Sequence, residues 1–182
     1  EKTTIELRPK FEAILLDAFS SLVSASSLQA ISEVVKKAAR SLASSDGVTF
    51  VLRDNDHCHY FDEDAISPLW KSQKFPMRIC ISGWVMLNRA PTVIEDIYLD
   101  PRIPIDALAM IPVRSADPIA AIGVYWKSQH KISEEQLSAL QELANAVSVS
   151  MENVMLYSRL EKKVNELERA NREKDEFLMT LS

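Results

Sequence analysis

The sequence predicts an α+β fold in which an antiparallel sheet is flanked by helices and a long coiled-coil helix forms the C-terminal part. Three observations carry this prediction. Apolar residues recur at helical spacing up to Leu42. Between residues 48 and 126 the period changes to two, and turn residues separate the short apolar runs. From Ser133 to Ser182 neither proline nor glycine occurs, as expected for one uninterrupted helix.

The composition is that of an ordinary globular protein. The chain has 182 residues, 47% of them hydrophobic and 26% charged, which allows one domain with a core and an extension. A net charge of -5 without a basic cluster argues against nucleic-acid binding, and no apolar stretch approaches the roughly 20 residues of a membrane span. Cys58 and Cys80 form no Cys-x-x-Cys pair, which fits a reducing cytoplasm. We therefore expect a cytoplasmic domain without nucleic-acid or membrane contacts.

Two amphipathic helices are predicted before residue 43, over residues 11–22 and 28–42. Ser26 and Gln29 have the spacing of a capping box for the second helix, and Gly47 follows its last apolar residue as a stop signal.

The alternating segments that follow predict an antiparallel sheet interrupted by one short helix. A hairpin is expected from residues 48–53 and 58–61 around the turn 54–56. The segment 81–88 is apolar on most sides and predicts a short buried helix. The remaining strands are predicted at 92–94, 108–113 and 119–126.

The C-terminal helix is predicted to begin with a capping box formed by Ser133 and Gln136, and its last part has a heptad pattern. About fifty residues would make a rod on the order of 75 Å. Alternating steps of four and three define an apolar seam that predicts a parallel homodimer, with Lys174 as a weak layer where the helix pair could change packing. A single solvated helix is the alternative. The seam comprises Leu160, Val164, Leu167, Asn171, Leu178 and Leu181.

The block from Ile81-Ser82-Gly83-Trp84-Val85 to Asp100-Pro101-Arg102 resembles the core of GAF domains, in which a glycine-containing helix precedes a proline, a short strand and an Asp-Pro-Arg turn. The implied organisation is an N-terminal helix over 1–26, a GAF-like sensor domain over 27–156, and a coiled-coil linker with the start of a histidine kinase dimerisation helix over 157–182. The resemblance departs at 104–107, where relatives carry a longer loop: either a lid-like loop is lost, or residues are missing from the sequence near Ile105 to Leu108.

The same resemblance implies a ligand pocket between the sheet and the segment around residue 81. The residues that it makes candidates to line this pocket are Phe50, Cys80, Trp84, Met110 and Tyr125. Each of them could equally be plain core, since large apolar residues are normally buried. Gly123 inside a strand indicates either close approach of a ligand or backbone, or a bulge.

No cofactor or metal is assigned. Bilin-binding GAF domains use a cysteine, often beside a histidine, but Cys58-His59 lies in the wrong strand for that pattern, which disfavours bilin. Strand alternation sends Cys58 to the face opposite His57 and His59, which disfavours haem or a metal. The acidic run 62–64 is interpreted as a solvated loop. No phosphate loop or nucleophile motif predicts enzymatic activity in this chain.

The segment from Asn171 to Ser182 resembles the approach to the phosphoacceptor box of histidine kinases, where the phosphorylated histidine would come next. The implied function is that of a signal-sensing regulatory domain of a bacterial two-component sensor histidine kinase. A response regulator would be the partner of the parent kinase, and a small molecule is a possible ligand. The alternatives are a ligand-free GAF dimerisation scaffold and the input domain of another output, such as a cyclase or a transcriptional activator.

Overall fold

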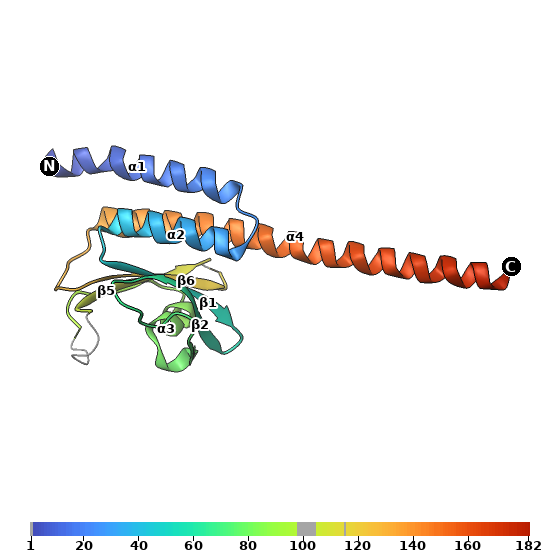
Figure 1. The fold of residues 1–182 in the computed structure, drawn as a ribbon. Helices are drawn as coiled ribbons and strands as arrows, with labels where there is room; N and C mark the ends of the chain where they lie inside the picture. The colour runs from blue at the N-terminus through green and yellow to red at the C-terminus, as the bar shows by residue number, and fades with distance from the viewer. Residues whose placement is uncertain (1, 98–104, 115) are drawn as a thin grey trace.

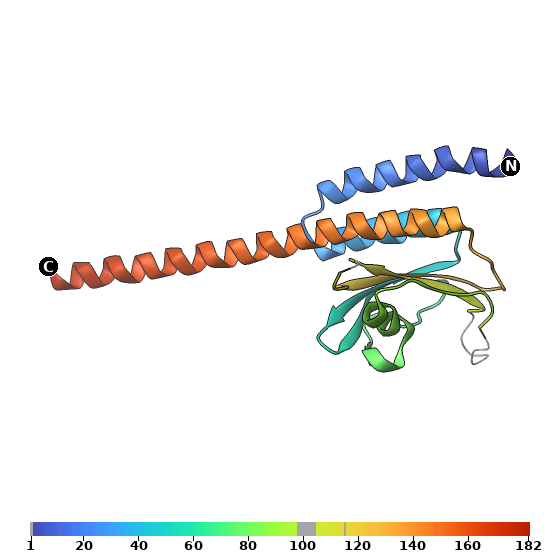
Figure 2. The ribbon, with the colours of Figure 1, turned by 180° about the vertical axis from the view of Figure 1, so that it is seen from behind.

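The computed structural model describes residues 2–97, 105–114 and 116–182, with side chains from residue 9 onward, and confirms the α+β prediction. Helices α1 (Lys2–Val23), α2 (Leu28–Ala43) and the first part of α4 (Glu134–Leu181) lie on one side of the sheet. The short helix α3 (Ile81–Asn88) lies on the other side (Figure 1). Seen from behind, α4 continues far beyond the sheet as a single straight rod (Figure 2).

Six strands form one antiparallel sheet in the order β3-β2-β1-β6-β5-β4. The predicted hairpin is β1 (Gly47–Asp54) with β2 (His57–Asp64), and the other predicted strands are β4 (Thr92–Ile94), β5 (Ala107–Val113) and β6 (Ala120–Trp126). Strand β3 (Lys74–Pro76) was not predicted, because three residues that end in a proline are too few to show a period. A 3-10 turn, Met77–Ile79, connects β3 to Cys80 and α3.

Two apolar clusters cover the two faces of the sheet. The larger lies between the sheet and the three long helices, and Phe50, Ile122 and Leu140 are fully buried in it. The smaller lies between the sheet and α3, and contains Met110 and Tyr125. Strands β5 and β6 are buried at every position, because both of their faces are covered.

The ends of α2 differ from the prediction by a few residues. Its N-cap is Ser27, whose side chain accepts a hydrogen bond from the backbone N–H of Ala30, so the predicted capping box at Ser26 is wrong. The helix ends with Ser44 in the left-handed conformation, and Gly47 is instead the first residue of β1.

Helix α4 begins with the predicted capping box, in which Ser133 Oγ accepts from the N–H of Gln136 while the Gln136 side chain accepts from the N–H of Ser133. Its first half is buried against the sheet, α1 and α2 through Leu140, Leu143 and Val147. From residue 156 onward every residue is exposed.

The Asp-Pro-Arg turn of the GAF-like block, and Pro104 of the short segment, lie outside the described residues. The description resumes at Ile105, which is buried in the smaller cluster. In the described part of the chain, no helix combines the length and apolar character needed to cross a membrane.

Candidate functional site

The structure brings three of the five predicted pocket residues together and separates two. Cys80, Met110 and Tyr125 belong to the cluster between the sheet and α3. Phe50 lies on the opposite face of β1, within the cluster that packs on the long helices. Trp84 points outward from α3 and is 49% exposed. The expectation that α3 is buried is therefore wrong for one of its sides, although Val85 and Met86 are buried.

Side chains of neighbouring strands fill the α3-facing surface of the sheet. A Cβ at Gly123 would lie 2.6 Å from Oγ1 of Thr49 and 2.8 Å from Cε of Met110. Both residues are the strand partners of Gly123, and the pairing of β6 is regular there, so neither a bulge nor a ligand accounts for this glycine. The ring of Tyr125 covers Gly47 in the same way. The one register shift of the hairpin lies elsewhere, between Phe50 and Val51.

Polar groups converge where α3 begins, next to β2. Cys80 is the half-buried N-cap residue of α3, and it packs against the apolar cluster that contains the buried Cys58 of β2. Ser82 Oγ donates to Cys80 Sγ at 3.4 Å and lies 3.1 Å from the hydroxyl of Tyr60. Burial raises the pKa of Tyr60 to about 12, which keeps its hydroxyl protonated.

The two thiols of this cluster titrate in opposite directions. The Cys58 thiol lowers the pKa of the Cys80 thiol, and the Ser82 hydroxyl lowers it further against the cost of burial. The contact with Cys80, together with burial, raises the pKa of the Cys58 thiol. Cys80 is therefore the thiol of the pair that ionises first. Sequence reasoning weighed both cysteines for cofactors but did not pair them, because 22 residues separate them along the chain.

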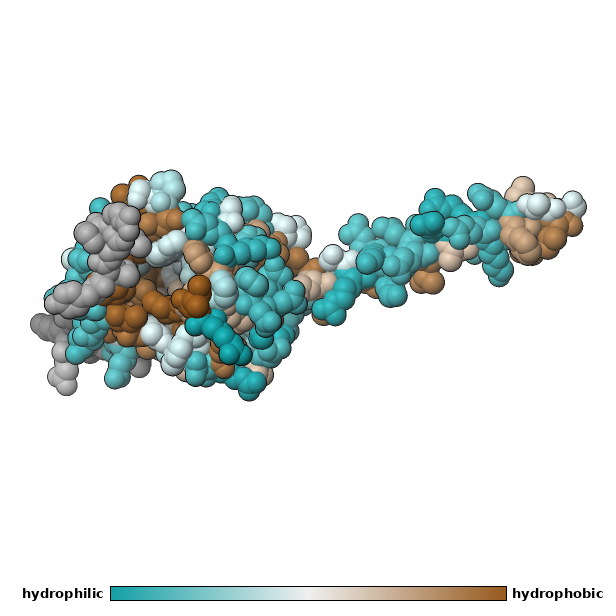
Figure 3. Space-filling model, turned by 90° about the horizontal axis from the view of Figure 1, so that it is seen from below, coloured by the Kyte–Doolittle hydropathy of each residue, from teal (hydrophilic) through white to brown (hydrophobic). Residues whose placement is uncertain are grey.

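An open apolar groove of about 480 Å³ lies beside this cluster, lined by Cys80, Trp84 and Thr92 among others. Seen from the α3 side, apolar side chains gather on the domain, whereas hydrophilic ones cover most of the projecting helix (Figure 3). Ile79, Trp84 and Leu87 are the exposed apolar side chains of the turn and helix that form this face.

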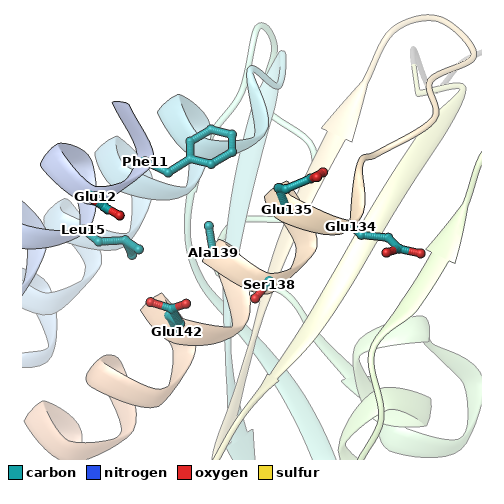
Figure 4. A pocket seen from close by; sticks show the side chains of 8 residues that line it. All are labelled: Phe11, Glu12, Leu15, Glu134, Glu135, Ser138, Ala139 and Glu142. Atoms are coloured by element: carbon teal, nitrogen blue, oxygen red, sulfur yellow. The ribbon is translucent and has the colours of Figure 1, made fainter. Parts of the chain in front are cut away.

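A second groove of about 470 Å³ separates α1 from the start of α4, and carboxylates line it (Figure 4). Glu134 and Glu135 occupy the first turn of α4, where the helix dipole favours negative charge, so a bound cation is not needed to explain them. Among the described residues, no group of three or more His, Cys, Asp or Glu side chains could hold a metal ion.

The acidic run 62–64 belongs to β2 and not to a solvated loop, so that interpretation was wrong. Asp62 is 1% exposed, and its carboxylate accepts a hydrogen bond from Ser32 Oγ at 2.6 Å. Lys36 and Lys71 each place an ammonium 2.9 Å from it. Burial opposes ionisation, but the Ser32 hydroxyl and the two ammonium groups outweigh it and hold the pKa of Asp62 below its usual range. The network fastens α2 and the segment after β2 to the sheet.

The predicted seam residues on α4 are all exposed, and two further apolar residues continue their line toward the domain. Val149 is 58% exposed and Leu156 is 57% exposed. Nine residues separate Leu156 from Val147, about two and a half turns, which places them on opposite sides of the helix. The heptad pattern alone did not reveal this continuation, since Val149 precedes the charged part of the helix.

Comparison with known proteins assigns the fold to a family. A family model described as GAF domain matches residues 25–152. The GAF domain of an Acinetobacter phosphoenolpyruvate-protein phosphotransferase is 15% identical with a TM-score of 0.70, over 79% of this chain and 93% of that chain. The GAF-B domain of DevS from Mycobacterium smegmatis is 17% identical with a TM-score of 0.61, over 70% and 94%.

A third similar structure is an enzyme, the free methionine-R-sulfoxide reductase of Neisseria meningitidis in complex with its substrate. It is 16% identical with a TM-score of 0.67, over 81% of this chain and 91% of that chain. Among curated protein sequences, none matches the chain. The family model covers most of the chain, including the sheet, α3 and the first part of α4, and the chain therefore belongs to the GAF domain family.

Proposed function

We propose that this GAF domain is the signal-sensing input module of a bacterial sensor histidine kinase, and that it works as a homodimer joined through α4. The observation that carries the proposal is the division of α4 into two faces. One face, with Val147 and Met151, is part of the domain core. The other begins at Val149 and continues through the exposed predicted seam. A change in the core would therefore reach the partner helix through one rigid element.

The predicted seam favours a dimer because it leaves a row of large apolar side chains in water when the helix is alone. Leu160, Val164 and Leu167 are each exposed in the single chain. Asn171 at an a position of the heptad would pair with its own copy and select the parallel register. A parallel pair would deliver the two C-terminal ends side by side, as a kinase dimer requires.

A ligand can shift such a helix pair only by its differential affinity for two arrangements of the domain. The part of the domain suited to respond is the cluster between the sheet and α3, because it is separate from the core that holds α4 in place. Signal binding there would act on α4 through the sheet.

One observation favours the second candidate function, a ligand-free dimerisation scaffold. Met110, Tyr125 and Val85 are buried between the sheet and α3, so side chains already occupy this space. The two functions predict different responses to small molecules. In a thermal-shift screen of the purified chain against a metabolite panel, a ligand that raises the melting temperature supports sensing. The absence of any such ligand supports the scaffold.

The dimer is tested by sedimentation of the chain with one matched pair of variants. Leu167→Lys places a charge in the seam, whereas Asn165→Lys places the same charge at a b position two residues away. We expect Leu167→Lys to shift the chain to monomer and Asn165→Lys to leave the dimer intact. Equal behaviour of the two variants would contradict the seam. The kinase output is tested by the natural residues that follow Ser182: a histidine at the next position supports it, and any other residue contradicts it.

A further inference from the structure

We propose that α1 forms the second half of the dimer interface, so that a second copy of the chain packs against α1 as well as against α4. The inference rests on the proposed homodimer and deepens it, because it assigns a contact surface outside the C-terminal helix. Two large apolar side chains of α1 are left in water in the single chain. They are Leu16, which is 68% exposed, and Val23, which is 89% exposed.

Helix α1 lies alongside the first part of α4 and runs in the same direction (Figure 1). Near the start of both helices, Phe11 and Ala139 line the groove between them. Near the end of α1, the backbone carbonyl of Leu22 accepts a hydrogen bond from Ser150 Oγ at 3.0 Å. Eleven residues separate the two contacts on each helix, so the helices keep the same level along this whole length.

The spacing of residues places Leu16 and Val23 on the side of α1 that faces the groove. Glu12 marks this side of α1, and Glu142 marks the groove side of α4, because both line the groove (Figure 4). Leu16 and Val23 follow Glu12 by 4 and 11 residues, about one and three helical turns. Val149 follows Glu142 by seven residues, about two turns, and therefore lies on the groove side of α4.

The apolar row on α4 leads from this groove into the predicted seam. Leu156 follows Val149 by a further seven residues, and Leu160 of the seam comes four residues later, on the same side of the helix. The hydrogen bond between the two helices places Val23 at the level of Val149. Exposed apolar side chains that lie together mark a contact surface. A second copy that covers the seam as far as Val149 therefore meets Val23 as well.

The proposed surface is apolar only toward the end of α1. Four carboxylates of the same chain line the other end of the groove, those of Glu12, Glu134, Glu135 and Glu142. A two-fold axis would bring the same four from the second copy. Like charges that face each other oppose contact. The two copies should therefore touch from Leu16 toward the seam and diverge toward the start of α4.

The test is sedimentation equilibrium of the full chain with three charge variants. Leu16→Lys and Val23→Lys place a charge on the proposed surface, whereas Ser21→Lys places it in the groove between α1 and α2. We expect the first two variants to raise the dissociation constant of the dimer at least about tenfold, and Ser21→Lys to leave it unchanged. Urea unfolding of dilute protein should show that all three fold as the unmodified chain does, because each replaced residue is exposed.

Hydroxyl-radical footprinting of the unmodified chain, above and below the dissociation constant, reads the same surface without a substitution. Leu16 and Val23 should become protected in the dimer, and the exposed Ile79 near α3 should not. If both α1 variants dimerise as Ser21→Lys does, while Leu167→Lys still gives monomers, the α1 surface is wrong and the α4 dimer stands. If the unmodified chain is monomeric at every concentration, the proposed dimer fails together with this inference.

Discussion

Val147 and Leu156 lie on opposite sides of α4: Val147 is fully buried against the sheet, and Leu156 is largely exposed at the end of the domain. The buried face of the helix holds the domain together, and the outer face is the one that we propose for contact with a second copy of the chain.

This relationship predicts that truncating each residue affects a different equilibrium. Val147→Ala should lower the free energy of unfolding by about 2 kcal/mol, since it removes packed methyl groups from the core. Leu156→Ala should leave the stability of the monomer within about 0.5 kcal/mol, but should weaken self-association. Urea unfolding of dilute protein measures the first effect, and sedimentation over a concentration series measures the second. A large loss of stability in dilute Leu156→Ala protein would show that the two faces are not separate.

The Asp62 network predicts a stability that depends on acid pH. The pKa of this carboxyl is lower in the folded chain than in the unfolded chain, where it is about 3.9, so ionised Asp62 stabilises the fold at neutral pH. That contribution is lost as the pH falls below about 3.9 and through the depressed folded pKa. Asp62→Asn should cost about 2 kcal/mol at pH 7, because Ser32 and two ammonium groups lose a charged partner. It should also make the free energy of unfolding depend less on pH in the acid range.

The matched control for Asp62 is Asp56→Asn in the exposed hairpin turn. It removes the same charge, so any general effect of net charge appears in both variants. Urea unfolding between pH 3 and pH 7 distinguishes them. If the free energy of unfolding falls as steeply with acid pH in Asp62→Asn as in the unmodified chain, other carboxyl groups cause the pH dependence.

The sequence predicted the strands of the sheet but not the face on which each β1 side chain lies, for one physical reason. Strand β1 is buried at its first five positions, because helices cover one face of it and side chains of the smaller cluster cover the other. Alternation in residues 48–52 therefore carries no information about which residue faces which layer, and Phe50 was assigned to the wrong side. Its face is fixed only by the register with β6 and by the shift in β2. The end of α4, by contrast, is exposed on all sides and carries one repeating apolar pattern, which the sequence shows directly.

The close neighbours of Gly123 predict that a larger residue at this position destabilises the fold. Gly123→Ala should destabilise the chain by about 2 kcal/mol, because the new Cβ meets Thr49 Oγ1 and the end of Met110. Thr49→Ala removes one of these atoms, so the cost of Gly123→Ala should be smaller in that background. A double-mutant cycle by urea unfolding measures the coupling. Additive effects would show that a different contact limits the size of residue 123.

Replacing Lys174 by an apolar residue would make the predicted seam apolar at this d position as well. In the proposed dimer it occupies a d position between Asn171 and Leu178, where two ammonium groups would face each other. Lys174→Leu should tighten the dimer at least about tenfold, equivalent to about 1.4 kcal/mol, by replacing this repulsion with apolar burial. Lys162→Leu, at an f position, adds the same side chain on the outer surface and should leave the dissociation constant unchanged. If both variants tighten the dimer equally in sedimentation, the gain comes from non-specific hydrophobic association, and the assigned seam is wrong.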